Sequence, residues 1–185
     1  MSIRRPVVAT TLIVGAIFTA GVVGAASLAS ASSVALHKSD VPAGYTFSSK
    51  TLTNAGMVSY TGIPKTQFDQ HGRITGLQNT LKGGSFEIIS FVSQYRTAAG
   101  AVWEYGKSSA SDLHHGRAVA ALKVDDRSIG FTQSTTSTNG SKIVGYGVDF
   151  QKGVYDMTAV VLSAPGKASI SLAGHYAQIM AGRAH

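Results

Sequence analysis

Two adjacent histidines beside an acid make the stretch SDLHHGR, residues 111–117, the first candidate for chemistry in this sequence. Imidazole and carboxylate groups bind metals and transfer protons. Histidines that share a metal commonly stand at i and i+4 on a helix, and residues i and i+2 share a face of a strand. His114 and His115 therefore point apart in either element. A metal site would need His71, His175 or a carboxylate brought in by the fold, so the sequence favours a solvated loop.

The remaining acids and the short motifs also lack the spacing of a catalytic site. Asp125 and Asp126 are neighbours, which rarely converge on one ligand, so a turn explains them. Asp149 and Asp156 flank a predicted turn at Gly153, but calcium would need a denser set of oxygen ligands. Neither G-x-S-x-G nor G-x-x-x-x-G-K-[ST] occurs in the sequence. We therefore predict no catalytic, cofactor-binding or metal-binding residues, no cofactor, and polar groups that are dispersed rather than gathered.

Aromatic residues could either stack on a ligand or build the core. Trp103 is the single tryptophan of the chain. Its helical neighbours favour a place in the core. A place in the core is likewise predicted for Tyr60, Tyr146 and Tyr155. The residues that would bind a ligand therefore stay unknown.

The first half of the chain has the periodicity of a strand, a hairpin and a helix. Alternating apolar residues predict a strand over residues 45–52 and a hairpin centred on Gly83 and Gly84. Thr97 is a good N-cap, and apolar residues spaced i, i+4 and i+7 after it predict a helix over residues 98–108. Residues 109–126 are expected to be loop-like, with the histidine pair in the loop and with RAVAALKV, residues 117–124, as either a short helix or an extended segment.

The second half has a clearer strand pattern. The dipeptide at residues 139–140, Asn-Gly, is typical of a type I′ hairpin turn, and strict alternation follows over residues 144–150. Another strand is expected over residues 154–162, which makes a three-stranded antiparallel meander. Ser169 can cap a final helix. The fold class is therefore α+β: an antiparallel sheet of about five to six strands, with two to three helices packed on one face.

The beginning of the chain has the pattern of a secretory signal peptide. Arg4 and Arg5 precede an uncharged stretch at residues 7–28, and residues 29–31 fit an A-x-A cleavage site. The apolar run is long, so an uncleaved membrane anchor through residues 7–28 is the alternative. We expect residues 1–31 to form this signal peptide or anchor and residues 32–185 to form a single α+β domain. The protein is expected to be secreted or extracytoplasmic.

Composition excludes several kinds of site. The chain has no cysteine, which excludes disulfides and thiolate metal ligands. Its formal net charge is +7, but the lysines and arginines are scattered and form no stripe. Nucleic-acid binding would need clustered charge and aromatic platforms. Nucleic acid is therefore not an expected partner.

Four segments of the sequence resemble uncharacterised exported proteins of bacteria. These segments are SDVPAGYTF, HGRITGLQNTL, SFVSQYRTAAGAVWEY and VDDRSIGF, in that order. They match the motifs D-x-P-x-G-[FY], G-R-[IV]-T-G and Y-[RK]-x-A-x-x-A of that group. The resemblance implies a PsbP-like α+β fold, related to mycobacterial lipoproteins and to the outer sensor domains of some receptor kinases. The chain lacks the lipobox cysteine and the disulfides of those relatives, and the resemblance transfers no functional residue.

These observations favour an exported, non-catalytic module that binds a small molecule or an envelope protein. An extracytoplasmic hydrolase with a site assembled from distant residues is one alternative. A membrane-tethered structural domain is the other. A deep cleft that holds a histidine beside a carboxylate would favour the enzyme.

Overall fold

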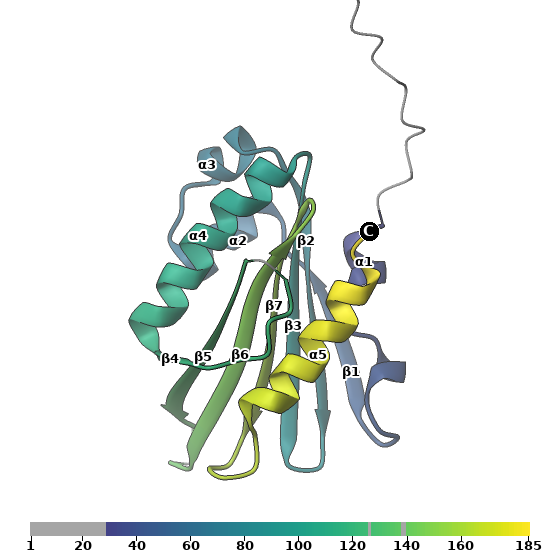
Figure 1. The fold of residues 1–185 in the computed structure, drawn as a ribbon, viewed down its shortest axis with the longest axis vertical. Coiled ribbons are helices and arrows are strands. Elements are labelled where there is room, and N and C mark those ends of the chain that lie inside the picture. Colours follow the sequence, from purple (N-terminus) through teal and green to yellow (C-terminus); the bar gives the residue numbers. More distant parts are fainter. Residues whose placement is uncertain (1–28, 126, 138–139) are drawn as a thin grey trace, which may run out of the picture.

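The structure is a computed structural model that describes residues 29–125, 127–137 and 140–185. These residues form one antiparallel sheet of seven strands, in the order β1-β2-β3-β7-β6-β5-β4 (Figure 1). The predicted α+β class is confirmed, with more strands than expected. The strands are β1 (Thr46–Thr51), β2 (Arg73–Gly83), β3 (Phe86–Tyr95), β4 (Arg117–Val119), β5 (Arg127–Thr136), β6 (Lys142–Lys152) and β7 (Tyr155–Ser163).

Five α-helices and one 3-10 turn accompany the sheet in the described residues, which again exceeds the predicted number. They are α1 (Ala31–Val34), the turn η1 (Lys38–Asp40), α2 (Asn54–Thr61), α3 (Lys65–Gln70), α4 (Ala98–His115) and α5 (Ile170–Arg183). None of the helices in this part of the chain has both the length and the apolar character that crossing a membrane requires.

Helices cover both faces of the sheet, and the prediction of a single covered face is wrong. Side chains alternate between the two faces of a strand. On β6, Val148 and Phe150 join the apolar cluster under α5, while Asp149 between them contacts Ser108 of α4. The central strands therefore lie between α4 and α5, which stand to the left and right of them in Figure 1.

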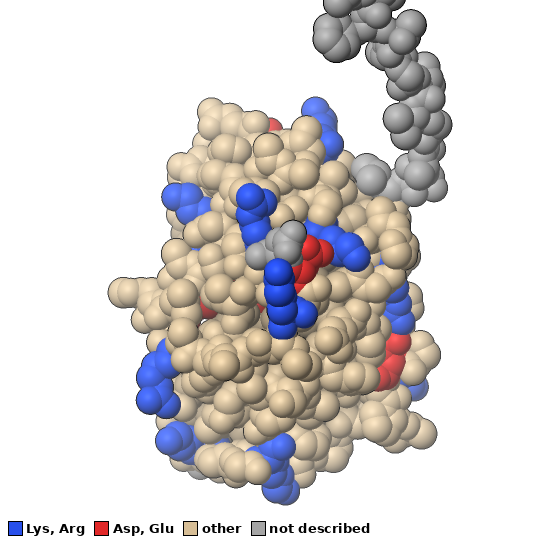
Figure 2. All heavy atoms as spheres, in the orientation of Figure 1, with Lys and Arg blue, Asp and Glu red and all other residues tan. Residues whose placement is uncertain are grey.

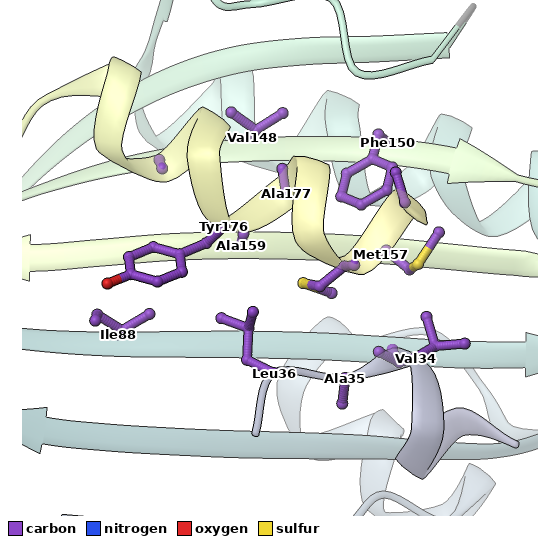
Figure 3. Close-up of a cluster of buried hydrophobic side chains, with 14 of the residues drawn as sticks. Val34, Ala35, Leu36, Ile88, Val148, Phe150, Met157, Ala159, Tyr176 and Ala177 are labelled. Atoms are coloured by element: carbon purple, nitrogen blue, oxygen red, sulfur yellow. The ribbon is translucent and has the colours of Figure 1, made fainter. Parts of the chain in front are cut away.

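The face under α1 and α5 is the main hydrophobic core. Figure 3 shows Phe150 of β6 and Met157 of β7 beneath the residues of α5 that face the sheet, with Leu36 beside them. Phe150, Met157 and Leu36 are fully buried. Ser169 begins α5 by accepting a hydrogen bond from the Leu172 N–H at 3.2 Å, as the sequence predicts. The core thus rests on strand alternation and a capped helix.

The predicted hairpins are present. β2 pairs with β3 around Gly84, which has a φ of +55° that favours glycine. The meander of β5, β6 and β7 is also confirmed. Asn139 and Asp126, assigned to turns in the sequence, lie outside the described residues.

Helix α4 is longer than predicted, so the loop prediction is wrong for residues 109–115, while residues 117–119 form the extended segment β4. The helix continues to His115 and includes Ser111 and Asp112. The Ser108 hydroxyl lies 3.2 Å from the Tyr105 carbonyl of its own helix and 2.9 Å from the Asp149 carboxyl of the sheet below it. Two histidines in the last turn also suit the negative end of the helix dipole. Packing on the sheet therefore overrides the weak local helix signal.

Residues 1–28, which contain most of the predicted signal peptide or anchor, lie outside the described residues. The described chain includes Ala29, whose carbonyl accepts hydrogen bonds from the side chains of Gln94 and Tyr155. On the face drawn in Figure 2, lysine and arginine side chains are scattered, with uncharged surface between most of them. This agrees with the dispersed positive charge of the sequence.

A candidate binding cleft between α2 and α4

The sheet face under α4 gathers buried acids. Glu104 of α4, Asp149 of β6 and Asp156 of β7 are 4 %, 0 % and 6 % exposed. Acids are almost never this buried unless they are paired or protonated. The expectation of dispersed polar groups is therefore wrong on this face of the molecule.

Arg73 provides the buried positive charge next to these acids. Its Nε lies 3.6 Å from Glu104 Oε2, and both side chains are almost fully buried. The Ser93 hydroxyl accepts from Arg73 Nε at 3.2 Å and lies 3.2 Å from Glu104 Oε1, to which it can donate. The Tyr95 hydroxyl donates to Glu104 Oε2. Burial raises the pKa of Glu104, against the opposing effects of the Tyr95 hydrogen bond and the Arg73 charge.

The G-R-[IV]-T-G motif has a structural role in placing this guanidinium. A Cβ atom added to Gly76 would stand 1.9 Å from Arg73 Nη2, so a side chain there would displace the guanidinium. Arg73 Nη1 donates to the Leu52 carbonyl and to Asn54 Oδ1, each at 2.9 Å. Gly76 therefore leaves the space in which Arg73 lies across β2 and reaches Glu104.

Asp149 is buried but has hydrogen-bond partners. Its Oδ2 lies 2.9 Å from Ser108 Oγ, and its Oδ1 lies 3.0 Å from Thr158 Oγ1. Burial, and then the nearby charge of Asp112, raise the pKa of Asp149 to about 8. The carboxyl is therefore mostly protonated at neutral pH, in which state it can also donate a hydrogen bond.

Asp156 differs from its neighbours because one of its oxygens has no partner. Its Oδ2 is 3.5 Å from Ser108 Oγ, and its Oδ1 makes no hydrogen bond. Among the described residues, Gln78 Oε1 is the only other buried side-chain oxygen or nitrogen without a partner. Burial, and then the charge of Asp149, raise the pKa of Asp156 well above its ordinary value. An unpartnered buried acid calls for an explanation, such as a ligand or a water.

Asp156 lines a cavity of about 170 Å³ between α2, α4 and the sheet. A second cavity of about 180 Å³ continues along α4 and shares four lining residues with the first: Tyr60, Thr61, Glu104 and Ser108. We call the two together the α2–α4 cleft. The first cavity also has an apolar wall of Leu52, Met57 and Phe91. Asp112, half-buried, lines the second.

Asp112 is the acid of the SDLHHGR stretch, and it lines the second cavity together with Ser111. Burial raises the pKa of Asp112 to about 7, and the charge of His115 opposes this shift. His114 and His115 are exposed, with ring centroids 5.0 Å apart and planes nearly perpendicular. The helix thus turns the acid toward the cleft and leaves both histidines in solvent.

The other histidines do not join the cleft. His71 stacks on Trp103 with 4.0 Å between ring centroids, and His175 is exposed on α5. No histidine lines either cavity. Within the described ranges, no three His, Cys, Asp or Glu side chains are placed to hold a metal ion.

Trp103 lies where the sequence places it, but Tyr60 does not. Trp103 is partly buried in a small apolar cluster with Leu52, Met57 and Phe68. Tyr60, expected in the core, is 51 % exposed at the rim of the cleft, where Lys50 Nζ donates to its hydroxyl at 2.8 Å. Its position on a short helix with little core contact explains the exposure.

Comparisons with known proteins define the fold. The structure is similar to the extracellular domain of PknH from Mycobacterium tuberculosis, with a TM-score of 0.53 and 12 % identity over 83 % of this chain and 93 % of that one. It is also similar to an uncharacterised protein of Mycobacterium smegmatis, the Rv0999 ortholog, with a TM-score of 0.55 and 12 % identity over 85 % and 98 %. No protein-family profile and no curated protein matches the sequence. The chain therefore shares a fold with an extracellular domain and with an uncharacterised protein of mycobacteria, while the sequence motifs of the resemblance stay a prediction.

Proposed function

We propose that this protein is an exported, non-catalytic module that binds a small molecule in the α2–α4 cleft. The observation that carries the proposal is Asp156, a buried acid that lines a cavity and whose Oδ1 has no hydrogen-bond partner. Binding sites commonly combine an apolar wall with a few such polar groups. Export is supported by the leader pattern of residues 1–31 and by the fold shared with an extracellular domain.

The arrangement of the cleft favours binding over hydrolysis. A serine nucleophile needs a base that removes its proton. The nearest carboxyl to Ser108 Oγ belongs to Asp149, at 2.9 Å, and its raised pKa keeps it protonated at neutral pH. Ser108 therefore has no free base beside it, and the hydrolase alternative has no specific support.

The proposal can be tested by NMR with a library of small organic fragments that contains amines, acids, alcohols and amides. We expect at least one fragment to shift backbone amide signals of α2, α4 and β7 together. Thr61→Trp should abolish these shifts, because Thr61 lines both cavities and is exposed at the cleft.

Ser59→Trp is the matched control. Ser59 is exposed on the same helix but lines neither cavity, so it should leave the shifts intact. If no fragment shifts the cleft signals, or if Thr61→Trp and Ser59→Trp behave alike, the cleft is not the binding site.

The anchor alternative is tested separately. The mass of the mature protein isolated from its native host shows whether residues 1–31 have been removed. Cleavage would support a secreted module. A retained apolar stretch at residues 7–28 would instead support a membrane tether.

A further inference from the structure

We propose that the ligand of the α2–α4 cleft carries a primary ammonium group, which donates a hydrogen bond to Asp156 Oδ1 as this carboxyl releases its proton to water. The inference rests on the proposed function and specifies the chemical class of the ligand. It follows from the charges around Asp156, from the hydrogen bonds already made there, and from the shape of the cleft.

Acidic residues outnumber basic residues around Asp156. Arg73 is the buried cation among the described residues that line or adjoin the cleft, and it lies against Glu104. Lys107 is exposed at the rim of the second cavity. The titratable groups that face Asp156 from the packed elements are Arg73 of β2, Tyr95 of β3, Glu104, Tyr105 and Asp112 of α4, and Asp149 of β6.

Arg73 does not occupy the place of the missing donor. Its Nε and Nη2 both donate to Ser93 Oγ, at 3.2 and 3.1 Å. Its Nη1 donates to Leu52 and Asn54. The N–H groups of the guanidinium named here are therefore engaged by Ser93, Leu52 and Asn54, and Asp156 Oδ1 still lacks a donor.

A ligand that is both charged and an N–H donor suits this oxygen. Without a ligand, burial and the neighbouring acids keep Asp156 in its neutral form. An incoming ammonium group supplies the opposite charge, so the carboxyl can ionise and accept an N–H···O hydrogen bond. The proton of Asp156 leaves to solvent, and the total charge of the cleft does not change. A quaternary ammonium has no N–H to donate and fits less well.

The apolar wall of the cleft specifies the rest of the ligand. Leu52 and Met57 are 3 % and 8 % exposed, and both belong to the small apolar cluster that Phe91 joins. A short alkyl or aryl group beside the ammonium would bury apolar surface there. The Tyr60 ring at the rim already has a cation–π contact with Lys50, whose Nζ lies 5.1 Å from the ring centroid. The inferred ligand is therefore a small amphiphilic amine.

The test compares four probes that share a four-carbon chain: n-butylamine, butyltrimethylammonium, n-butanol and butyrate. Their affinities are measured for the whole protein by NMR titration of the cleft signals. We expect n-butylamine to bind most tightly. Its affinity should increase between pH 6 and pH 9, because the proton on Asp156 competes with it. Calorimetry in two buffers of different ionisation heat should show proton release on binding.

Asp156→Asn should weaken n-butylamine binding by about ten- to a hundredfold, the range expected for a hydrogen bond to a charged group. Its affinity for n-butanol should change little. Asp149→Asn is the comparison variant: Asp149 belongs to the same acidic group and raises the pKa of Asp156 but lines neither cavity, so this variant should not weaken n-butylamine binding. If Asp156→Asn does not fold, Thr61→Trp, which covers the cleft, must abolish n-butylamine binding instead.

The outcomes separate this inference from the proposed function. If n-butanol or butyrate binds as tightly as n-butylamine, or if butyltrimethylammonium does, the ammonium assignment is wrong while the cleft remains a binding site. Unchanged n-butylamine affinity in Asp156→Asn would also overturn the assignment. If no probe and no fragment shifts the cleft signals, the proposed function itself fails.

Discussion

The two faces of the central sheet are both buried, but different chemistry covers them. Under α5, the side chains of β6 and β7 are apolar and pack against small and apolar helix residues such as Ala177. Under α4, the same strands present Asp149 and Asp156 to a helix that carries Glu104. The first face stabilises the fold by excluding water, while the second holds acids that lose hydration on folding. Acids in such a place are better explained by a ligand than by stability.

The largest effect should come from the apolar face. Phe150 is fully buried in the core under α5. Phe150→Ala removes its contacts and leaves a cavity, so the free energy of unfolding should fall by about 3–5 kcal/mol. Urea denaturation at a single pH measures this. The loss should be the same at pH 5 and pH 8, because Phe150 lies in the hydrophobic cluster while the buried acids lie on the other face of the sheet; a strong pH dependence of the loss would contradict the separation of the two faces.

The polar face should make stability depend on pH. The pKa of Asp149 is about 8 in the folded protein and about 3.9 in an unfolded chain. Between these values the folded state holds a proton that the unfolded state has lost. The free energy of unfolding should therefore decrease as pH rises from about 4 to about 8, with a limiting slope of about 1.4 kcal/mol per pH unit for one such group.

Asp149→Asn isolates this effect. The amide keeps the shape of the side chain and can still bond the hydroxyls of Ser108 and Thr158. We expect the variant to be more stable than the parent by about 1–3 kcal/mol between pH 5 and pH 6 and to match it near pH 4, because the parent loses stability with the slope given above. The raised pKa values of Asp156 and Asp112 leave a residual slope in the same direction. Denaturation curves across this pH range measure how the free energy of unfolding of the parent and of the variant depends on pH. Equal slopes for the two proteins would show that Asp149 is ionised in the folded protein.

The elements of the apolar face could be predicted from the sequence, because the signals that specify them lie within short stretches of the chain. The alternation around Val148 and Phe150 and the N-cap Ser169 identify strands and a helix without knowledge of the rest of the chain. The turn at Gly84 likewise specifies the β2–β3 hairpin. These elements are confirmed, and they account for most of the sheet.

The polar face could not be predicted, because its residues meet only through the fold. Glu104 and Asp156 are 52 positions apart in the sequence, and their proximity depends on where α4 crosses the sheet. The local sequence pattern also predicts that α4 ends at residue 108, although the helix continues to His115, and so it assigns Asp112 to a loop. One signal was present: Asp149 and Asp156 each interrupt a strongly apolar strand, which is unusual unless the second face is covered too.

The smallest effects should come from the caps of the two long helices, and they sharpen the comparison. Ser169 caps α5 and Thr97 caps α4, each accepting one backbone N–H hydrogen bond at 3.2 Å. Ser169→Ala and Thr97→Ala should each lower the free energy of unfolding by about 1 kcal/mol. Only Thr97→Ala should also weaken n-butylamine binding, because α4 carries Glu104 and Ser108 to the cleft and α5 carries none of its lining. Urea denaturation and NMR titration of both variants measure the two effects. Equal changes in amine affinity would mean that the cleft responds to overall stability rather than to the position of α4.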